Sequence, residues 1–377
     1  MTLSAAQVQA RLRDWLDTNV DGWSDVRLRP LEVALGSGFS AEIFFVDVDF
    51  RDADGSQSRT LVVRRQPGDL EVVLGSSLEL QGRMMAALDR LRVTPVPEWV
   101  GMELDSTILD MPFLIMGRVD GQSATQNPNY NSKGWLAEMS PVQRRQSWKN
   151  AIEAYAKMSR IDWQADGFSF LARSEWGEPG LDQYLGHIEA WYHGCRKDRV
   201  MPYVDRAIGY IREQQPKDTD VNVLWGDSTP SNVMFADDGS VNALIDWELA
   251  ALGPSELDLA WWLYFDDLFS RRFGVERLEG LPTRDETIAI WESETGRRAQ
   301  HLEYYDVVVA LRMALVAVGA FDRQVGIGNI PPENKSLNAN FMTLYLAERL
   351  GMKLPELGPD FYAFMSNMTP VDQKDDG

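Results

Sequence analysis

The stretch that decides the fold is Leu224–Asp258, which reads LWGDSTPSNVMFADDGSVNALIDWELAALGPSELD. Short apolar runs at 221–224 and 241–245 lie on either side of the turn sequence ADDGS at 236–240, as expected for buried strands with a tight turn between them. A plain hairpin, with carboxylates that only cap turns, would account for one Asp at the end of a strand. It does not account for the ordered polar residues that the stretch contains.

Three oxygen-bearing side chains follow one another in this stretch. Asp227 comes after the first apolar run, Asn232 lies five residues later, and Asp246 directly follows the second run. Carboxylate and amide oxygens are the ligands that hard divalent cations prefer, and Mg²⁺ in proteins usually keeps waters and shares phosphate oxygens. The stretch therefore predicts an oxygen-rich pocket for a magnesium-bound phosphate.

The same stretch resembles the catalytic region of the aminoglycoside phosphotransferase family of small-molecule kinases. The features that carry the resemblance are Gly226-Asp227-x4-Asn232, Ile245-Asp246-Trp247-Glu248 and Gly253-x4-Asp258-Leu259-Ala260. Protein kinases differ, since they have Asp-Phe-Gly at the second carboxylate and an Ala-Pro-Glu segment after it. The resemblance implies that Asp227 accepts the proton of the attacking hydroxyl, that Asn232 and Asp246 hold the metal, and that Asp258 anchors the loop.

One residue departs from the family pattern. The family usually has His two residues before the catalytic Asp, and this chain has Trp225 there. Because the family residue mainly supports the loop, we expect Trp225 to brace it by packing. The departure also leaves open a second interpretation, a catalytically silent nucleotide-binding protein with a kinase-like fold.

Length and composition exclude several other classes of protein. At 377 residues the chain exceeds what one core supports, so two lobes are expected. A net charge of −20 argues against nucleic acid and anionic membranes as partners, and it suits a cationic substrate or simply solubility. The single Cys195 and three scattered histidines exclude a disulfide framework and Cys- or His-based metal clusters. Together with an N-terminus that lacks a signal-peptide core, they favour a cytoplasmic protein.

The N-terminal part of the chain predicts a helix over 5–19 and then an antiparallel meander. Strands are expected over 31–35, 42–50 and 60–65, with a hairpin turn at Asp54-Gly55. A glycine loop between the first two strands lets backbone amides approach phosphates, although an ordinary hairpin also explains so short a motif. The residues expected to cover the phosphates are Gly36, Ser37 and Gly38.

The third strand carries side chains that the resemblance places at the nucleotide. Kinases grip the α- and β-phosphates with a Lys on this strand, and the aligned residue here is Arg64. Val62 points to the same face and would touch the adenine. Alternatively, Arg64 ends an edge strand in solvent. Kinases pair the gripping base with a Glu from the next helix, expected over 77–91, where the family register gives Gln81 with Glu79 nearby; the partner stays open between Glu79 and neither.

The expected fold class is α+β, a bilobal protein-kinase-like fold. Residues 1–118 would form a nucleotide-binding lobe with an antiparallel sheet plus one helix, and residues 119–377 a larger, mainly helical lobe for catalysis and substrate binding. The segment 112–121 resembles the family's last strand and hinge, or is a plain buried strand that ends at a Gly turn. In the hinge interpretation the adenine edge is bound by backbone groups of Met116, Gly117 and Arg118.

The C-terminal part predicts helices that, in the resembling family, build the acceptor pocket. Ser140-Pro141-x-Gln143 is a helix start. Further helical patterns cover 181–196, 201–214, 258–269, 301–321 and 335–350, and the longest apolar run, 307–321, is too short for a membrane span and predicts a buried helix. Candidate acceptor contacts are Glu248, Trp262 and Asp266, although a core position explains Trp262, and a solvated helix face Asp266, more simply.

The expected function is an ATP- and Mg²⁺-dependent O-phosphotransferase that acts on the hydroxyl of a small molecule. Phosphates would lie under residues 36–38, held by Arg64 and by magnesium on Asn232 and Asp246. The acceptor is either aminoglycoside-like or a metabolic alcohol such as a hydroxyacyl thioester.

Overall fold

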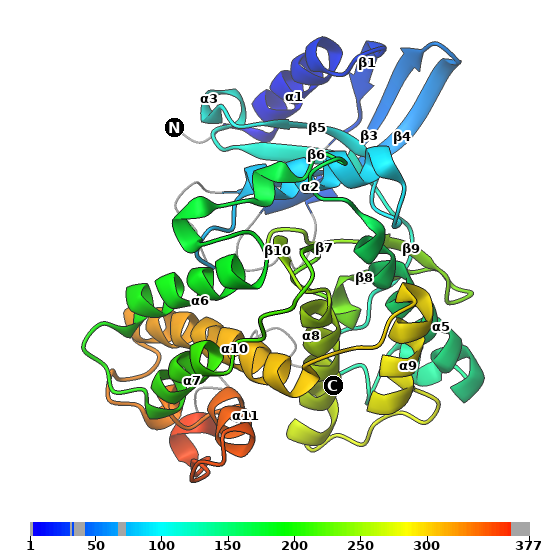
Figure 1. Cartoon of the computed structure of the whole chain (residues 1–377). Coiled ribbons are helices and arrows are strands. Elements are labelled where there is room, and N and C mark those ends of the chain that lie inside the picture. The colour runs from blue at the N-terminus through cyan, green and yellow to red at the C-terminus, as the bar shows by residue number, and fades with distance from the viewer. Residues whose placement is uncertain (1–2, 31, 34–41, 67–72, 363–377) are drawn as a thin grey trace, which may run out of the picture.

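The structure is a computed structural model that describes residues 3–30, 32–33, 42–66 and 73–362. The predicted phosphate loop, Gly36 to Gly38, lies outside the described residues. Figure 1 shows an antiparallel sheet with helices beside it, above a larger region made mainly of helices. This arrangement confirms the expected fold class. The domain boundary at residue 118 stays a prediction.

The N-terminal sheet has the strand order β1-β3-β4-β6-β5, with β2 paired to β3, and every pairing is antiparallel. The strands β3 and β4 pair along their whole length around the predicted Asp54-Gly55 turn. The strand bounds are β1 Ser24–Leu28, β2 Glu32–Val33, β3 Glu42–Asp52, β4 Gly55–Arg65, β5 Trp99–Glu103 and β6 Phe113–Gly117, and a short helix, α3 (Ser106–Leu109), joins the last two. The sheet brings the end of β4, with Arg64, towards the helical region.

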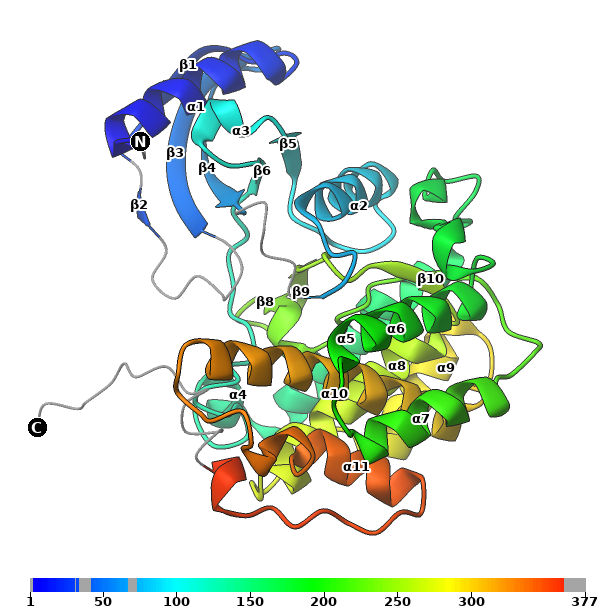
Figure 2. The same cartoon turned by 90° about the vertical axis from the view of Figure 1, so that its left-hand side faces the viewer.

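Two helices flank the sheet. Helix α1 (Ala5–Asn19) starts at a Ser4–Gln7 capping box and buries Leu12 and Leu16 in the small core of the sheet. Helix α2 (Leu78–Leu91) starts at Ser77, whose hydroxyl accepts from the Leu80 amide at 3.1 Å. In Figure 2, α1 lies on the outer side of the sheet and α2 lies between β5 and the C-terminal helices. The buried stripe of α2 therefore joins the sheet to the large core.

The C-terminal region is built from helices whose positions largely match the predicted patterns. Helix α6 covers the predicted residues, whereas α9 was not predicted and the pattern at 335–350 is split into a short turn and α11. The longer helices are α5 Pro141–Ala156, α6 Leu181–Arg196, α7 Pro202–Glu213, α8 Glu256–Asp267, α9 Arg284–Thr295, α10 Leu302–Gly326 and α11 Phe341–Arg349. A π-helical turn, Leu268–Arg272, continues α8, and α4 (Trp135–Glu138) precedes α5.

Helix α10 runs through the middle of this region and packs against α6, α7, α8 and α11. Its length and composition alone would allow it to cross a membrane, but 72% of its most apolar window is buried inside the protein. The helix is therefore a core element, as the run 307–321 predicted.

Two small antiparallel sheets lie between the large sheet and the helices. Strand β7 (Asn222–Leu224) pairs with β10 (Ala251–Gly253), and β8 (Val233–Phe235) pairs with β9 (Val241–Leu244). The two apolar runs of the quoted stretch thus pair with other strands and not with each other. Consequently the two carboxylates come from separate sheets that meet at one place.

Candidate functional site

The strand pairing places Asn232 next to Asp246. The short turn that ends at Asn232 leads into β8, and the β8–β9 ladder is extended by the Ile245 amide, which donates to the Asn232 carbonyl at 2.9 Å. Asp246 follows directly, with a φ of 60°, in the left-handed region where the chain leaves the ladder. The amide and the carboxylate that were predicted to share a metal are therefore neighbours across one pair of strands.

Asp258 anchors the loop that carries Asp227. Its carboxylate accepts from the backbone amides of Trp225 (2.8 Å) and Gly226 (2.9 Å), and its own carbonyl accepts from the Ser228 hydroxyl at 2.7 Å. Burial raises the pKa of Asp258 to about 6, and the two amide hydrogen bonds oppose that shift. This contact is the anchor that the family resemblance implied.

Gly226 allows the loop that carries Asp227 to approach the chain after Asp246 closely. Its φ is +84°, and a Cβ at this position would overlap the carbonyl of Leu249. The Gly226 carbonyl accepts from Arg312 Nη1 of α10 at 2.7 Å, and the same nitrogen donates to the Tyr184 hydroxyl at 3.0 Å. The Arg312 side chain is therefore buried and paired within the protein.

Asp227 is held at both carboxylate oxygens. Oδ1 accepts from the Trp261 indole at 2.8 Å, and Oδ2 accepts from the Asn232 amide at 2.7 Å. Burial, and next the negative charge of Asp246, raise the pKa of Asp227 to about 7, while hydrogen bonds from Trp261 and Asn232 and the charge of Arg312 lower it. A carboxylate that is oriented and has a pKa near neutrality is suited to take a proton from an alcohol.

Trp225 supports the loop, as expected, but through a hydrogen bond as well as packing. The side chain is fully buried, and its ring lies 5.6 Å from that of Trp247. Its indole N–H donates to the Ile245 carbonyl at 2.9 Å, one residue before Asp246. The loop of Asp227 is therefore tied directly to the segment that carries Asp246.

Arg64 reaches across from β4 to the same segment. Nη2 donates to Glu248 Oε2 at 2.6 Å, and Nη1 lies 3.4 Å from Asp246 Oδ1. The side chain is only 9% exposed, so the alternative in which it ends an edge strand in solvent is wrong. Burial and the neighbouring Asp246 raise the pKa of Glu248, and Arg64 opposes this shift.

The expected partner of Arg64 on α2 is not its partner here. Glu79 is exposed and pairs with Arg83 at 3.5 Å, and Gln81 is buried with an amide oxygen that has no hydrogen-bond partner among the described residues. The carboxylates that contact Arg64 both come from the loop after β9. Glu248 thus takes the place that the helix residue holds in the kinase pattern.

The hinge segment forms the predicted strand, and two of its backbone amides are hydrogen-bonded within the sheet. Val62 is half-buried on β4, opposite Met116 of β6. The Gly117 amide donates to the Glu98 carbonyl at 2.8 Å, and the Arg118 amide donates to the Thr60 carbonyl at 2.9 Å. Neither N–H is available to an adenine edge in this arrangement, because both complete the sheet.

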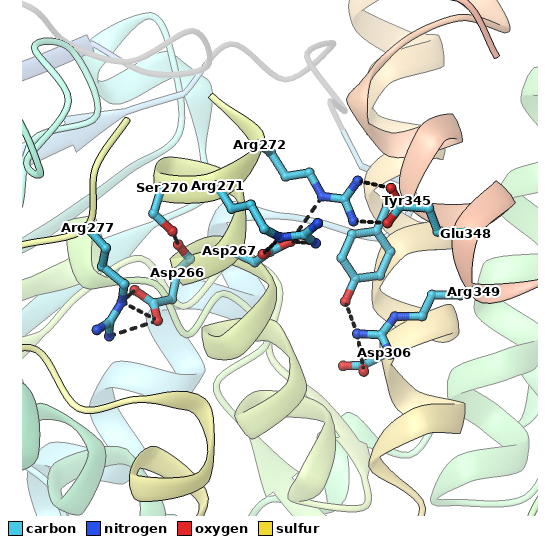
Figure 3. A network of polar contacts seen from close by, with 10 residues as sticks. All are labelled: Asp266, Asp267, Ser270, Arg271, Arg272, Arg277, Asp306, Tyr345, Glu348 and Arg349. Atoms are coloured by element: carbon cyan, nitrogen blue, oxygen red, sulfur yellow. Dashed lines mark hydrogen bonds and ion pairs between the residues drawn. The ribbon is translucent and has the colours of Figure 1, made fainter. Parts of the chain in front are cut away.

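The three candidate acceptor contacts have other partners. Glu248 pairs with Arg64, and Trp262 is fully buried with its ring 5.0 Å from that of Trp148, so it presents no surface to an acceptor. Asp266 is nearly buried and accepts from Arg277 Nε at 3.0 Å. Figure 3 shows this pair at one end of a network of arginines and carboxylates that also holds Asp267 and Asp306.

The sequence did not assign the roles of two residues at the site. Trp261, not Trp262, contacts Asp227, and Arg312 fixes the Gly226 carbonyl. A signal existed for each. Trp261 lies three residues after the anchor Asp258 and so on the same face of α8, and Arg312 is the one charged residue in the apolar run 307–321.

The residues present suit a divalent cation bound together with phosphates. Asp246 and Glu248 both contact the guanidinium of Arg64. Burial, and next the negative charge of Asp246, raise the pKa of Asp227 and of Glu248. No three His, Cys, Asp or Glu side chains form a metal cluster anywhere among the described residues, and this includes the present site. An open site of one carboxylate and one amide, completed by phosphate oxygens, is the coordination that Mg²⁺ favours.

Comparison with known proteins gives a family and several relatives. Residues 33–293 match the model of the phosphotransferase enzyme family. Among curated proteins, the chain is 24% identical over 279 residues to the mouse acyl-CoA dehydrogenase family member 10, covering 71% of this chain and 25% of the relative. It is 21% identical over 348 residues to the orangutan (Pongo abelii) acyl-CoA dehydrogenase family member 11, covering 88% and 41%. The chain therefore spans a quarter to two fifths of the length of these relatives.

Solved structures share the fold. A protein of Ralstonia eutropha JMP134, named provisionally as an aminoglycoside phosphotransferase, has a TM-score of 0.65 at 21% identity, with 91% of this chain and 98% of that chain covered. The GDP and kanamycin complex of APH(2")-IIIa has a TM-score of 0.53 at 13% identity, covering 92% and 96%. A complex of APH(4)-Ia with ADP and hygromycin B has a TM-score of 0.51 at 14% identity, covering 95% and 99%.

Proposed function

Because the chain belongs to the phosphotransferase enzyme family, we propose that it transfers the γ-phosphoryl group of ATP to the hydroxyl of a small molecule, with Mg²⁺ as the metal. The observation that carries this proposal is the convergence of Asp227, Asn232 and Asp246, with Asp227 held by two hydrogen bonds at a pKa of about 7. Positioning and charge stabilisation supply most of the rate in phosphoryl transfer, so a rigid constellation of this kind suits the reaction.

Each residue has a role that follows from its contacts. Asp227 orients the acceptor hydroxyl and takes its proton. Asn232 and Asp246 would hold Mg²⁺, which neutralises developing charge on the phosphates when bound. Arg64 would grip the phosphates, since a guanidinium stays charged in any environment and can bind anions in a bidentate way. The presence of Asp227, Asn232 and Asp246, and the support that Trp225 gives to the loop of Asp227, favour an active enzyme over a silent nucleotide-binding protein.

The acceptor is proposed to be a metabolic alcohol such as a hydroxyacyl thioester, with an aminoglycoside-like acceptor as the second candidate. The names of the curated relatives, which belong to acyl-CoA dehydrogenase families, support the first. The kanamycin and hygromycin B complexes of the structural neighbours support the second.

A calorimetric titration tests the nucleotide part of this proposal. ATP should bind the wild-type protein in the presence of Mg²⁺, and Asp246→Asn should weaken that binding while leaving binding without Mg²⁺ nearly unchanged. Asp238→Asn, in the exposed turn between β8 and β9, is the control. If Asp246→Asn binds Mg²⁺-ATP as the wild-type protein does, the metal role of Asp246 is wrong.

A coupled assay of ADP release tests the acceptor. Kanamycin, choline, homoserine and a hydroxyacyl-CoA should be compared at saturating Mg²⁺-ATP. Slow ATP hydrolysis without acceptor, lost in Asp227→Asn, would support an active enzyme, whereas no turnover with or without any acceptor would support the silent alternative.

A further inference from the structure

A largely apolar cavity of about 550 Å³ lies in the C-terminal region, lined by the end of α8, by α10 and by the start of α11. Phe265, Phe269 and Phe273 line one side, and Ala317 and Ala320 of α10 line the other. Among the described residues that surround it, none carries a charged side chain, and the remaining contacts are aliphatic, methionine or aromatic groups and neutral amides. Apolar hollows of this size on a protein surface usually mark a site that binds a ligand or another protein.

A row of aromatic side chains on one face of α8 runs from Asp227 to the wall of the cavity. Trp261, which donates to Asp227 Oδ1, has its ring 5.4 Å from that of Phe265. Phe265 stacks on Phe269 at 5.9 Å, and Phe269 lies 5.5 Å from Phe273. These four aromatic residues recur every four positions, so they stand in a row on the same side of the helix and its π-helical extension. The row begins at the catalytic carboxylate and ends in the cavity.

The loop on the other side of the cavity also touches the catalytic loop. Gln126 lines the cavity, and its Nε2 donates to the hydroxyl of Ser231, the residue before Asn232, at 2.9 Å. A ligand in the cavity would therefore lie against both α8 and the loop that contains Gln126, and each of these contacts the region of Asp227 and Asn232.

Two of the polar side chains that line the cavity, Asn129 and Asn340, bind other groups of the protein. Asn129 donates to the Phe269 carbonyl at 2.7 Å, and Asn340 caps α11 by accepting from the amides of Met342 and Thr343. The nearby carboxylates Asp266 and Asp267 pair with arginines in the network of Figure 3 and do not line this cavity. The described lining residues offer a polycationic ligand no carboxylate, so apolar burial is the interaction that they provide.

We propose that this cavity is the acceptor subsite and that it takes an apolar chain of an alcohol whose hydroxyl reaches Asp227. The inference rests on the proposed phosphotransferase function and adds the chemical class of the acceptor. The head of the acceptor lies at Asp227, and its hydrocarbon part lies along Phe265 and Phe269.

A direct binding experiment tests the cavity without relying on turnover. A series of 1,2-alkanediols from butanediol to decanediol is titrated into the full-length protein with Mg²⁺ and a non-hydrolysable ATP analogue, and binding is followed by calorimetry. Each added methylene should tighten binding about threefold until the cavity is filled. Binding without dependence on chain length, or no binding of decanediol, overturns the proposal.

Two variants locate the binding. Ala317→Phe fills the cavity and should abolish the dependence on chain length. Phe273→Ala removes a partly exposed ring without overpacking and should weaken decanediol binding by about tenfold. Gly319→Phe is the matched control, because this position on α10 is exposed and has open space where a Cβ would lie. An equal effect of Gly319→Phe and Ala317→Phe would contradict the assignment.

The outcomes of these experiments distinguish a failure of the cavity assignment from a failure of the proposed function. If the nucleotide analogue does not bind the wild-type protein, the proposed function fails whatever the diols do. If the analogue binds to all variants but the diols show no preference for length, only the cavity assignment fails. Sedimentation of the same proteins tests whether a second copy of the chain fills the cavity instead. A wild-type oligomer that dissociates in Ala317→Phe would show this and would overturn the proposal.

Discussion

The Arg64 guanidinium donates to the Glu248 carboxylate at 2.6 Å, which joins the last part of β4 to the loop after β9 across 184 residues of sequence. The contact is largely shielded from water, with Arg64 9% and Glu248 19% exposed. It links the sheet to the segment that carries Asp246, so it connects the two parts of the molecule at the proposed phosphate site.

Glu248→Gln should destabilise the nucleotide-free protein by about 1–3 kcal/mol, because it leaves a nearly buried guanidinium with weaker compensation. Glu79→Gln is the control, since it breaks an exposed pair with Arg83 and should cost less than about 0.5 kcal/mol. Urea unfolding of the three proteins measures both effects. Saturating Mg²⁺-ATP should reduce the deficit of Glu248→Gln, because the phosphates offer Arg64 another anionic partner. Equal costs for the two variants would show that the pair does not join the two parts.

Trp225→Phe should destabilise the protein and slow turnover, because it leaves the buried Ile245 carbonyl without its indole donor. Trp148→Phe is matched to it, since Trp148 is also fully buried but its indole N–H has no hydrogen-bond partner among the described residues. We expect Trp225→Phe to cost about 1–2 kcal/mol more than Trp148→Phe in thermal unfolding. If the two variants are equally stable and equally active, Trp225 acts by packing alone.

Arg312 is a positioning residue, and the pH dependence of turnover separates its charge from its packing. The charge of Arg312 lowers the pKa of Asp227, so Arg312→Met should move the acidic limb of kcat/KM to higher pH as well as slow the reaction. Arg312→Lys keeps the charge and should move the limb less. A limb that stays in place in Arg312→Met would show that Arg312 supports the loop without acting on Asp227.

The stability of the metal-free protein should depend on the protonation of Asp227. Its pKa is about 7 in the folded protein and near 4 in an unfolded chain, so the folded state binds the proton more tightly. This group therefore favours folding at low pH, and that contribution is lost as the pH rises through about 7. The free energy of unfolding of Asp227→Asn, minus that of the wild-type protein, should rise by about 1 kcal/mol between pH 6 and pH 8. A difference that does not change with pH would contradict the raised pKa.

The sequence could reveal the oxygen-bearing side chains of the site and most of the helices, because those features are local. Asp227 and Asp246 follow short strands, Asn232 directly precedes one, and the capping box at Ser140 marks the start of α5. Helix α9 was missed although Thr283 and Glu286 form the same kind of box, since its apolar stripe is weak.

The sequence could not reveal which side chains meet across the fold. The choice of Glu248 over Glu79 as the partner of Arg64 depends on how the sheet sits against the C-terminal region. Trp261 and Trp262 are adjacent in sequence, and only the placement of α8 shows that the first faces Asp227 while the second faces the core. The hinge amides were likewise committed to sheet hydrogen bonds that no local pattern shows.

The most direct test of the central claim is the rate of γ-phosphoryl transfer by Asp227→Asn to an acceptor that the wild-type protein uses, measured by rapid quench at saturating Mg²⁺-ATP. Loss of a positioned base should lower this rate by about 10²–10⁴, with the affinity for Mg²⁺-ATP nearly unchanged. Transfer at the wild-type rate would show that Asp227 neither orients the hydroxyl nor takes its proton, and the role proposed for it would be wrong.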